Sequence, residues 1–199
     1  MTRVKAYGWR QDNHYELSKA REALVQLHQK VTAQNYVTGG LEVYIQDSLL
    51  RSAIILGHFS AALEAYNDFL ELNLGNYRED LQMETRLLGL IPHYEFGNWQ
   101  LLDSLIRSAS RLIERKYPHF ELGRLFVKAV KTCVALQKAQ TPRAEMALIW
   151  RKIKKDALSI ASKQRLADYI IFTGWIDRQI KGGSVAERVY EVTQTGYRV

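Results

Sequence analysis

The chain has 199 residues, of which 47% are hydrophobic and 25% are charged, and its formal net charge is +7; this composition is ordinary for a folded soluble protein. Its single cysteine, Cys133, excludes a disulfide within the chain and a cysteine-rich metal cluster. Residues 1–10 have no apolar signal-peptide core, and no apolar run approaches the ~20 residues that span a bilayer. We therefore expect a cytoplasmic protein with no membrane partner.

The first part of the chain predicts one helix. Residues 1–11 show no clear period and are interpreted as an N-terminal extension. Asp12 or Asn13 can cap the helix that follows, which is expected to end near residue 35, before Thr38-Gly39-Gly40. Apolar residues recur at helical spacing on its core-facing side, namely Tyr15, Ala20, Leu24, Leu27 and Val31.

Glycines delimit the next three helices, which are predicted over 41–56, 59–74 and 78–96. Gly57, Gly75-Asn76 and Gly97-Asn98 supply the turns that end them. Pro92 lies inside the last of the three. Because proline has no backbone N–H, we expect a kink there or a weakened hydrogen bond to Leu88.

Four further helices complete the predicted order. One runs from Trp99 to Tyr117-Pro118, and another covers 119–138. A third begins at Thr141-Pro142 and has an apolar stripe through Ile160, and the last covers 164–181. Residues 184–199 form a C-terminal tail, interpreted as a short extra helix and a loose end. Short connections between about eight helices predict antiparallel helix pairs in one all-α domain over residues 1–199.

The stretch from Gly57 to Leu72 resembles the turn and second helix of a tetratricopeptide repeat (TPR). Phe59 matches the turn aromatic, Ala62 the small packing residue and Tyr66 the second aromatic, and Leu70 and Leu72 close the helix. A looser copy begins at Gly97-Asn98-Trp99, forty residues later. The resemblance implies a right-handed array of antiparallel helix pairs.

The same stretch departs from the TPR pattern in several places. Phe69 stands where a small residue is usual, and Leu74 stands where a closing proline is usual. Leu50 occupies a position where glycine is common, and the forty-residue spacing exceeds the usual ~34 residues. The unit is therefore TPR-like rather than a regular TPR.

On a larger scale, Tyr15 to about Cys133 is similar to the C-terminal half of long TPR-like helical proteins of Bacteroidetes bacteria. The likeness lies in Tyr15 to Leu24, in Leu87 to Trp99, and in Leu105-Ile106-Arg107-Ser108. It implies that the chain is part of a longer solenoid, whose uncapped first helix would favour self-association. The likeness supplies no activity.

The TPR resemblance implies a noncatalytic scaffold that binds a peptide or a partner protein on its concave face. The first helix of each pair lines that face. The matching exposed positions are Tyr44, Asp47, Arg51, Glu84 and Tyr94. The plainer interpretation of these residues is ordinary exposed or half-buried helix positions.

The charge is unevenly spread, which favours a second hypothesis. Residues 107–165 contain 15 Lys or Arg and four Asp or Glu, whereas the remainder of the chain is acidic on balance. A nucleic acid or another polyanion could bind this half. The basic residues proposed for it are Arg107, Arg111, Arg115, Arg151, Lys152, Lys154 and Lys155. The plainer interpretation is a set of solvated outer helix faces.

Catalytic and metal-binding patterns are weak in this sequence. Gly39-Gly40 and Gly182-Gly183 are isolated turn glycines rather than a phosphate-binding loop. The five histidines are far apart, and a zinc site needs three or four converging ligands. His93-Tyr94-Glu95 is the most site-like cluster, but such a pair more often satisfies a helix end. We therefore expect no enzyme, no cofactor and no metal.

Overall fold

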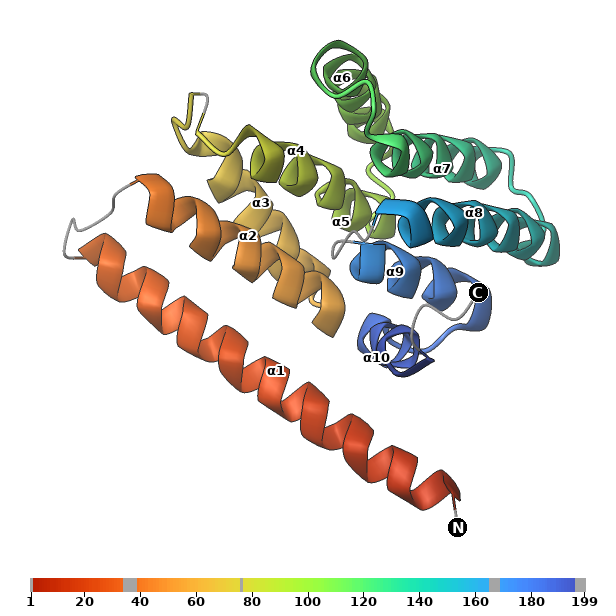
Figure 1. The fold of residues 1–199 in the computed structure, drawn as a ribbon, viewed down its shortest axis with the longest axis horizontal. Helices are drawn as coiled ribbons and strands as arrows, with labels where there is room; N and C mark the ends of the chain where they lie inside the picture. Colours follow the sequence, from red (N-terminus) through yellow and green to blue (C-terminus); the bar gives the residue numbers. More distant parts are fainter. Residues whose placement is uncertain (1, 34–38, 76, 165–168, 196–199) are drawn as a thin grey trace.

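The structure is a computed structural model that describes residues 2–33, 39–75, 77–164 and 169–195, leaving out the side chains of 2–14, 39, 143, 161–164, 169, 194 and 195. Every regular element of this described part is an α-helix, so the predicted all-α class is confirmed (Figure 1). The helices are α1 (Thr2–Ala33), α2 (Gly39–Leu56), α3 (Phe59–Glu71), α4 (Glu79–Leu88), α5 (Leu90–Glu95), α6 (Trp99–Lys116), α7 (Glu121–Lys138), α8 (Arg143–Gln164), α9 (Tyr169–Lys181) and α10 (Val185–Thr195).

Helix α1 is longer than predicted. It begins at Thr2, so residues 2–11 are helical and the helix passes through 12 and 13 without a cap there. It lies along the edge of the molecule against α2 and α10 (Figure 1). None of its described side chains is buried. Tyr15, Ala20 and Leu27 are exposed, so the predicted core stripe is wrong at these three residues.

Several predicted helix ends move in the structure. α3 stops at Glu71 because Leu72 takes an extended conformation, with φ −67° and ψ 127°. α7 begins at Glu121 rather than 119, and α8 continues to Gln164, where the next helix was predicted to begin. The predicted end near 35 and turn at Thr38, the turn residue Asn76, and the first residues after the predicted start at 164 lie outside the described residues.

The predicted fourth helix is broken where Pro92 weakens it. α4 ends at Leu88, the residue whose carbonyl Pro92 has no N–H to bond, and α5 begins at Leu90. Gly89 stands between them, and a Cβ there would lie 2.3 Å from Cε2 of the buried Tyr66 ring. Because Gly89 has no Cβ, the Tyr66 ring of α3 can pack closely against the break.

A residue in the left-handed conformation ends each of four helices, α2, α5, α7 and α9. These residues are Gly57 (φ 76°), Gly97 (φ 68°), Gln140 (φ 53°) and Gly182 (φ 75°). At the first, the Gly57 N–H bonds the Ile54 carbonyl and the His58 N–H bonds the Ala53 carbonyl. The same pair of bonds follows α5 and α7, which identifies a Schellman motif at all three ends. The predicted turns at Gly57, Gly97 and Gly182 are confirmed.

The described helices from α2 onward include pairs in which two consecutive helices pack against each other. α2 packs against α3, α5 against α6, α7 against α8 and α9 against α10. α4 contacts α2 of one pair and α7 of another, so it lies between these two pairs. The last pair does not extend the stack away from the first, however, because both α9 and α10 contact α2 (Figure 1). The two ends of the array are therefore joined.

Candidate functional site

A polar network joins α2 to α4 and contains three of the predicted site residues. Asp47 Oδ2 lies 2.6 Å from Arg51 Nε, and Arg51 Nη2 lies 3.3 Å from Glu84 Oε2. The hydroxyl of Thr85, which is fully buried, donates to Asp47 Oδ1 at 2.8 Å. Asp47 is itself buried, so its predicted exposure is wrong, and it fixes Arg51 beside the half-buried Glu84.

Tyr44 lies near the beginning of α2 and is exposed, as predicted. The Arg78 guanidinium donates to the Tyr44 hydroxyl and lies 5.2 Å from the centroid of its ring. Asp80 accepts from Arg78 at 2.7 Å, and this hydrogen bond lowers the pKa of the Asp80 carboxyl. Tyr44 is therefore held against the start of α4 by a cation.

Tyr94 was predicted on the exposed face and is instead buried. Its ring makes edge-to-face contacts with Trp99, Trp150 and Trp175 at centroid distances of 5.5, 6.3 and 5.3 Å. Burial raises the pKa of Tyr94 to about 12. Tyr94 lies on the apolar face of α5, which packs into the core. Burial of the aromatic ring away from water stabilises the folded protein.

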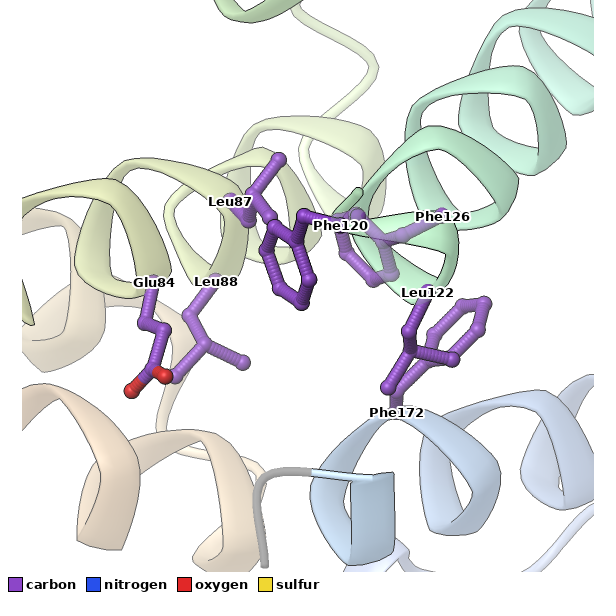
Figure 2. A pocket seen from close by; sticks show the side chains of 8 residues that line it. Glu84, Leu87, Leu88, Phe120, Leu122, Phe126 and Phe172 are labelled. Atoms are coloured by element: carbon purple, nitrogen blue, oxygen red, sulfur yellow. The ribbon is translucent and has the colours of Figure 1, made fainter. Parts of the chain in front are cut away.

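An apolar pocket opens next to Glu84, between α4, α7 and α9. Figure 2 shows the side chains of Leu88, Phe120 and Phe172 converging on it. Its volume of about 40 Å³ leaves room for roughly three water-sized groups. The full lining is Glu84, Leu87, Leu88, Phe120, Leu122, Gly123, Phe126 and Phe172. Of these, Glu84 alone is ionisable.

The pocket depends on close packing at the start of α7. A Cβ on Gly123 would lie 2.5 Å from Cδ1 of Phe120, so glycine allows the Phe120 ring to fold back over the helix. Phe126 stacks edge-on with Phe172 at 4.4 Å, which joins α7 to α9. Sequence reasoning found Glu84 but missed these aromatic walls. They come from the residue before α7, from α7 itself and from α9, and only the packing of these two helices makes them neighbours.

The predicted basic residues do not form one patch. Arg107, Arg111 and Arg115 are exposed on the side of α6 opposite its buried residues, and no ion pair found among the described residues includes them. The other group lies on α8, and α7 separates the two helices (Figure 1). Within that group Arg151, Lys152 and Lys155 are exposed.

Lys154 differs from its neighbours on α8. Its Nζ lies 2.6 Å from Oδ2 of Asp177, a carboxylate of α9 that is 3% exposed. Lys154 therefore neutralises a buried acid and joins two helices. This pairing is a different role from the phosphate contact predicted for Lys154.

The His93-Tyr94-Glu95 cluster separates into three different environments. His93 Nδ1 lies 3.2 Å from Asn98 Nδ2, and burial lowers the pKa of His93. Glu95 faces α9 instead of His93, pairing with Arg178 at 2.6 Å.

The described residues contain no group of three or more His, Cys, Asp or Glu side chains arranged to hold a metal ion. Cys133 is buried, which raises the pKa of its thiol.

Within the part of the chain that the structure describes, no helix combines the length and the apolar character needed to cross a membrane. Comparison of the chain with protein-family models, with curated proteins and with solved structures finds no match.

Proposed function

We propose that this protein is a noncatalytic interaction module, in which the pocket between α4, α7 and α9 receives one apolar side chain of a partner peptide. The observation that carries the proposal is the composition of that pocket. Its walls are aliphatic and aromatic, and a single carboxylate, that of Glu84, stands at its edge (Figure 2). Apolar pockets with few polar groups are the usual anchors of ligand side chains.

The size and charge of the pocket define the peptide. A volume of about 40 Å³ suits one Val, Leu or Met side chain rather than a whole small molecule. Glu84 is 28% exposed, so a cation on the same peptide can share its carboxylate with Arg51. The proposed partner is therefore a peptide segment that has an aliphatic residue close to a Lys or Arg.

Two features of the fold support a TPR-like interpretation of this surface. The left-handed residues 57, 97, 140 and 182 recur at intervals of about forty residues, one at the turn of each helix pair. The pocket is lined by α7 and α9, the first helices of their pairs, and by α4, which directly precedes α5, the first helix of another pair. First helices line the binding face in the TPR family that the sequence resembles.

The test is a panel of labelled 12-residue peptides, each with one Val, Leu, Met or Phe and one Lys at varied spacing, titrated by fluorescence anisotropy. We expect micromolar binding by a subset. Glu84→Gln should weaken it about fivefold, because a partly exposed ion pair contributes ~1 kcal/mol. Leu122→Phe should fill the pocket and abolish binding.

Matched controls separate the pocket from general effects. Glu114→Gln removes an exposed carboxylate on α6, and Leu148→Phe enlarges a side chain of α8 that is 61% exposed. Both should bind like the wild type. The proposal fails if no peptide binds below millimolar concentration, or if the pocket and control variants bind equally.

The exposed arginine ridge of α6 favours a second candidate function, binding of a single-stranded nucleic acid. Arg107, Arg111 and Arg115 lie one turn apart on the same side of the helix, where they can contact successive phosphates. Anisotropy of a labelled 20-nucleotide poly(U) RNA at 50 and 200 mM NaCl tests this. Binding should fall steeply with salt and be lost in the triple Arg→Glu variant. A failure to bind at 50 mM NaCl would exclude it.

A further inference from the structure

A second cavity lies where the ends of α5, α7 and α9 meet the start of α8. Its volume is about 480 Å³, within the ~300–1,000 Å³ typical of small-molecule sites. In contrast to the apolar pocket, its walls carry a carboxylate, a guanidinium, two amides and a hydroxyl. The lining residues are Glu95, Gln137, Thr141, Met146, Trp150, Arg178, Gln179, Gly182 and Gly183.

Glu95 orients the other polar groups of this cavity. Its Oε1 accepts hydrogen bonds from Trp175 Nε1 at 2.7 Å and from Gln179 Nε2 at 2.8 Å. Its Oε2 lies 2.6 Å from Nη1 of Arg178. Both carboxylate oxygens are therefore engaged, so Glu95 is a positioning residue here and the contacts to a ligand fall to Arg178 and Gln179.

The carboxylate fixes which atoms its partners present to the cavity. A carboxylate only accepts, so Gln179 must turn its amide N–H toward Glu95, which leaves the amide oxygen as an acceptor. The Gln137 amide N–H donates to the Tyr94 hydroxyl at 3.4 Å, so its oxygen is likewise left as an acceptor. Neither amide oxygen has a partner among the described residues.

Arg178 supplies the complementary donors. A guanidinium has five N–H groups, and Glu95 engages only part of this set. The Phe59 ring lies 5.3 Å from the Arg178 guanidinium carbon and restricts its movement from a second helix. The side chain remains 29% exposed, so donors are still accessible to a ligand.

We propose that this cavity binds a small zwitterion of the α-amino-acid class. Arg178 bonds the carboxylate, the amide oxygens of Gln137 and Gln179 accept from the ammonium group, and the apolar side chain lies against Met146 and Trp150. The charges of Glu95 and Arg178 cancel, which matches a ligand without net charge. The site is separate from the apolar pocket and does not rest on the proposed peptide binding.

The experiment screens the twenty L-amino acids, each at 5 mM, by thermal shift, and then measures Kd by isothermal titration calorimetry. We expect at least one apolar amino acid to raise the Tm of the wild type. Its N-acetyl and methyl-ester forms, which lack the ammonium and the carboxylate charge respectively, should each bind at least tenfold more weakly.

Two variants locate the site. Arg178→Gln removes the carboxylate partner, and Gln137→Leu removes one amide oxygen, together with the N–H that bonds Tyr94, at an exposed position. Each should weaken binding at least tenfold, whereas Gln26→Leu, the same change at an exposed position of α1, should not. The proposal is overturned if no amino acid shifts the Tm, if the N-acetyl form binds as tightly, or if Gln137→Leu binds like the wild type.

Discussion

The carboxylate of Glu95 on α5 accepts a hydrogen bond of 2.7 Å from the indole N–H of Trp175 on α9, eighty positions further along the chain. Trp175 is fully buried, so its N–H needs a protein partner. The bond therefore connects the second helix pair to the fourth. It acts together with the contact of α10 on α2 to close the array.

The first prediction concerns this connection. Glu95→Gln keeps the size of the side chain but replaces the charged acceptor of three donors with one neutral oxygen. Hydrogen bonds to charged groups contribute about 1.5–3 kcal/mol each in favourable cases. We expect urea unfolding to show a free energy of unfolding lower by about 2 kcal/mol. Glu114→Gln on α6 should change it by less than ~0.5 kcal/mol. Equal losses in the two variants would contradict the role of Glu95.

The second prediction concerns Gly89. Alanine there places a Cβ 2.3 Å from Cε2 of Tyr66, a ring that is 2% exposed and has little room to move. We expect Gly89→Ala to lower the free energy of unfolding by about 2–3 kcal/mol through overpacking. Gly57→Ala is the control, since its Cβ meets nothing within 4 Å and adds only left-handed strain of ~1–2 kcal/mol. A smaller loss at 89 than at 57 would show that the Tyr66 contact is loose.

The sequence predicted the helical class and three of the four left-handed turns, those at Gly57, Gly97 and Gly182. Gly57 and Gly97 were found because glycine followed by an aromatic is a visible pattern. The equivalent position after α7 is Gln140, which takes φ 53° without being glycine, so the third turn gave no such signal. The closure of α10 onto α2 was also missed, because each helix has its own apolar stripe and no local pattern specifies its partner.

The candidate site was predicted only in part, because local sequence patterns do not specify which helices pack together. The TPR resemblance placed Asp47, Arg51 and Glu84 on one face of neighbouring helices, and the structure brings them together. Spacing did not separate exposed from buried, so Asp47 and Tyr94 were assigned to the surface although their helices turn them inward. The ion pair of Lys154 with Asp177 joins two helices and could not be predicted from the local sequence around either residue.

The third prediction concerns the polar network between α2 and α4. Thr85→Val keeps the shape of the side chain and removes the hydroxyl that donates to the buried carboxylate of Asp47 at 2.8 Å. We expect the free energy of unfolding to fall by about 1–2 kcal/mol, measured by urea denaturation. Thr132→Val is matched to it, because the Thr132 hydroxyl donates only to the Lys128 carbonyl of its own helix at an exposed position. It should cost less than ~0.5 kcal/mol. If Thr85→Val is as stable as Thr132→Val, the hydrogen bond from Thr85 to Asp47 does not stabilise the folded protein.

The fourth prediction concerns pH. Burial lowers the pKa of His93 below its ordinary value, so the unfolded chain binds a proton more readily than the folded protein does. Stability from a neutral His93 is therefore fully present above the unfolded pKa of ~6.5, and it is lost as the pH falls through the lower folded pKa. Urea denaturation between pH 7.5 and 5 should show a steeper loss of stability in the wild type than in His93→Gln. His119→Gln, at an exposed position, should keep the wild-type slope. Parallel slopes for the wild type and His93→Gln would mean that His93 accepts its proton without disturbing the packing around Tyr66.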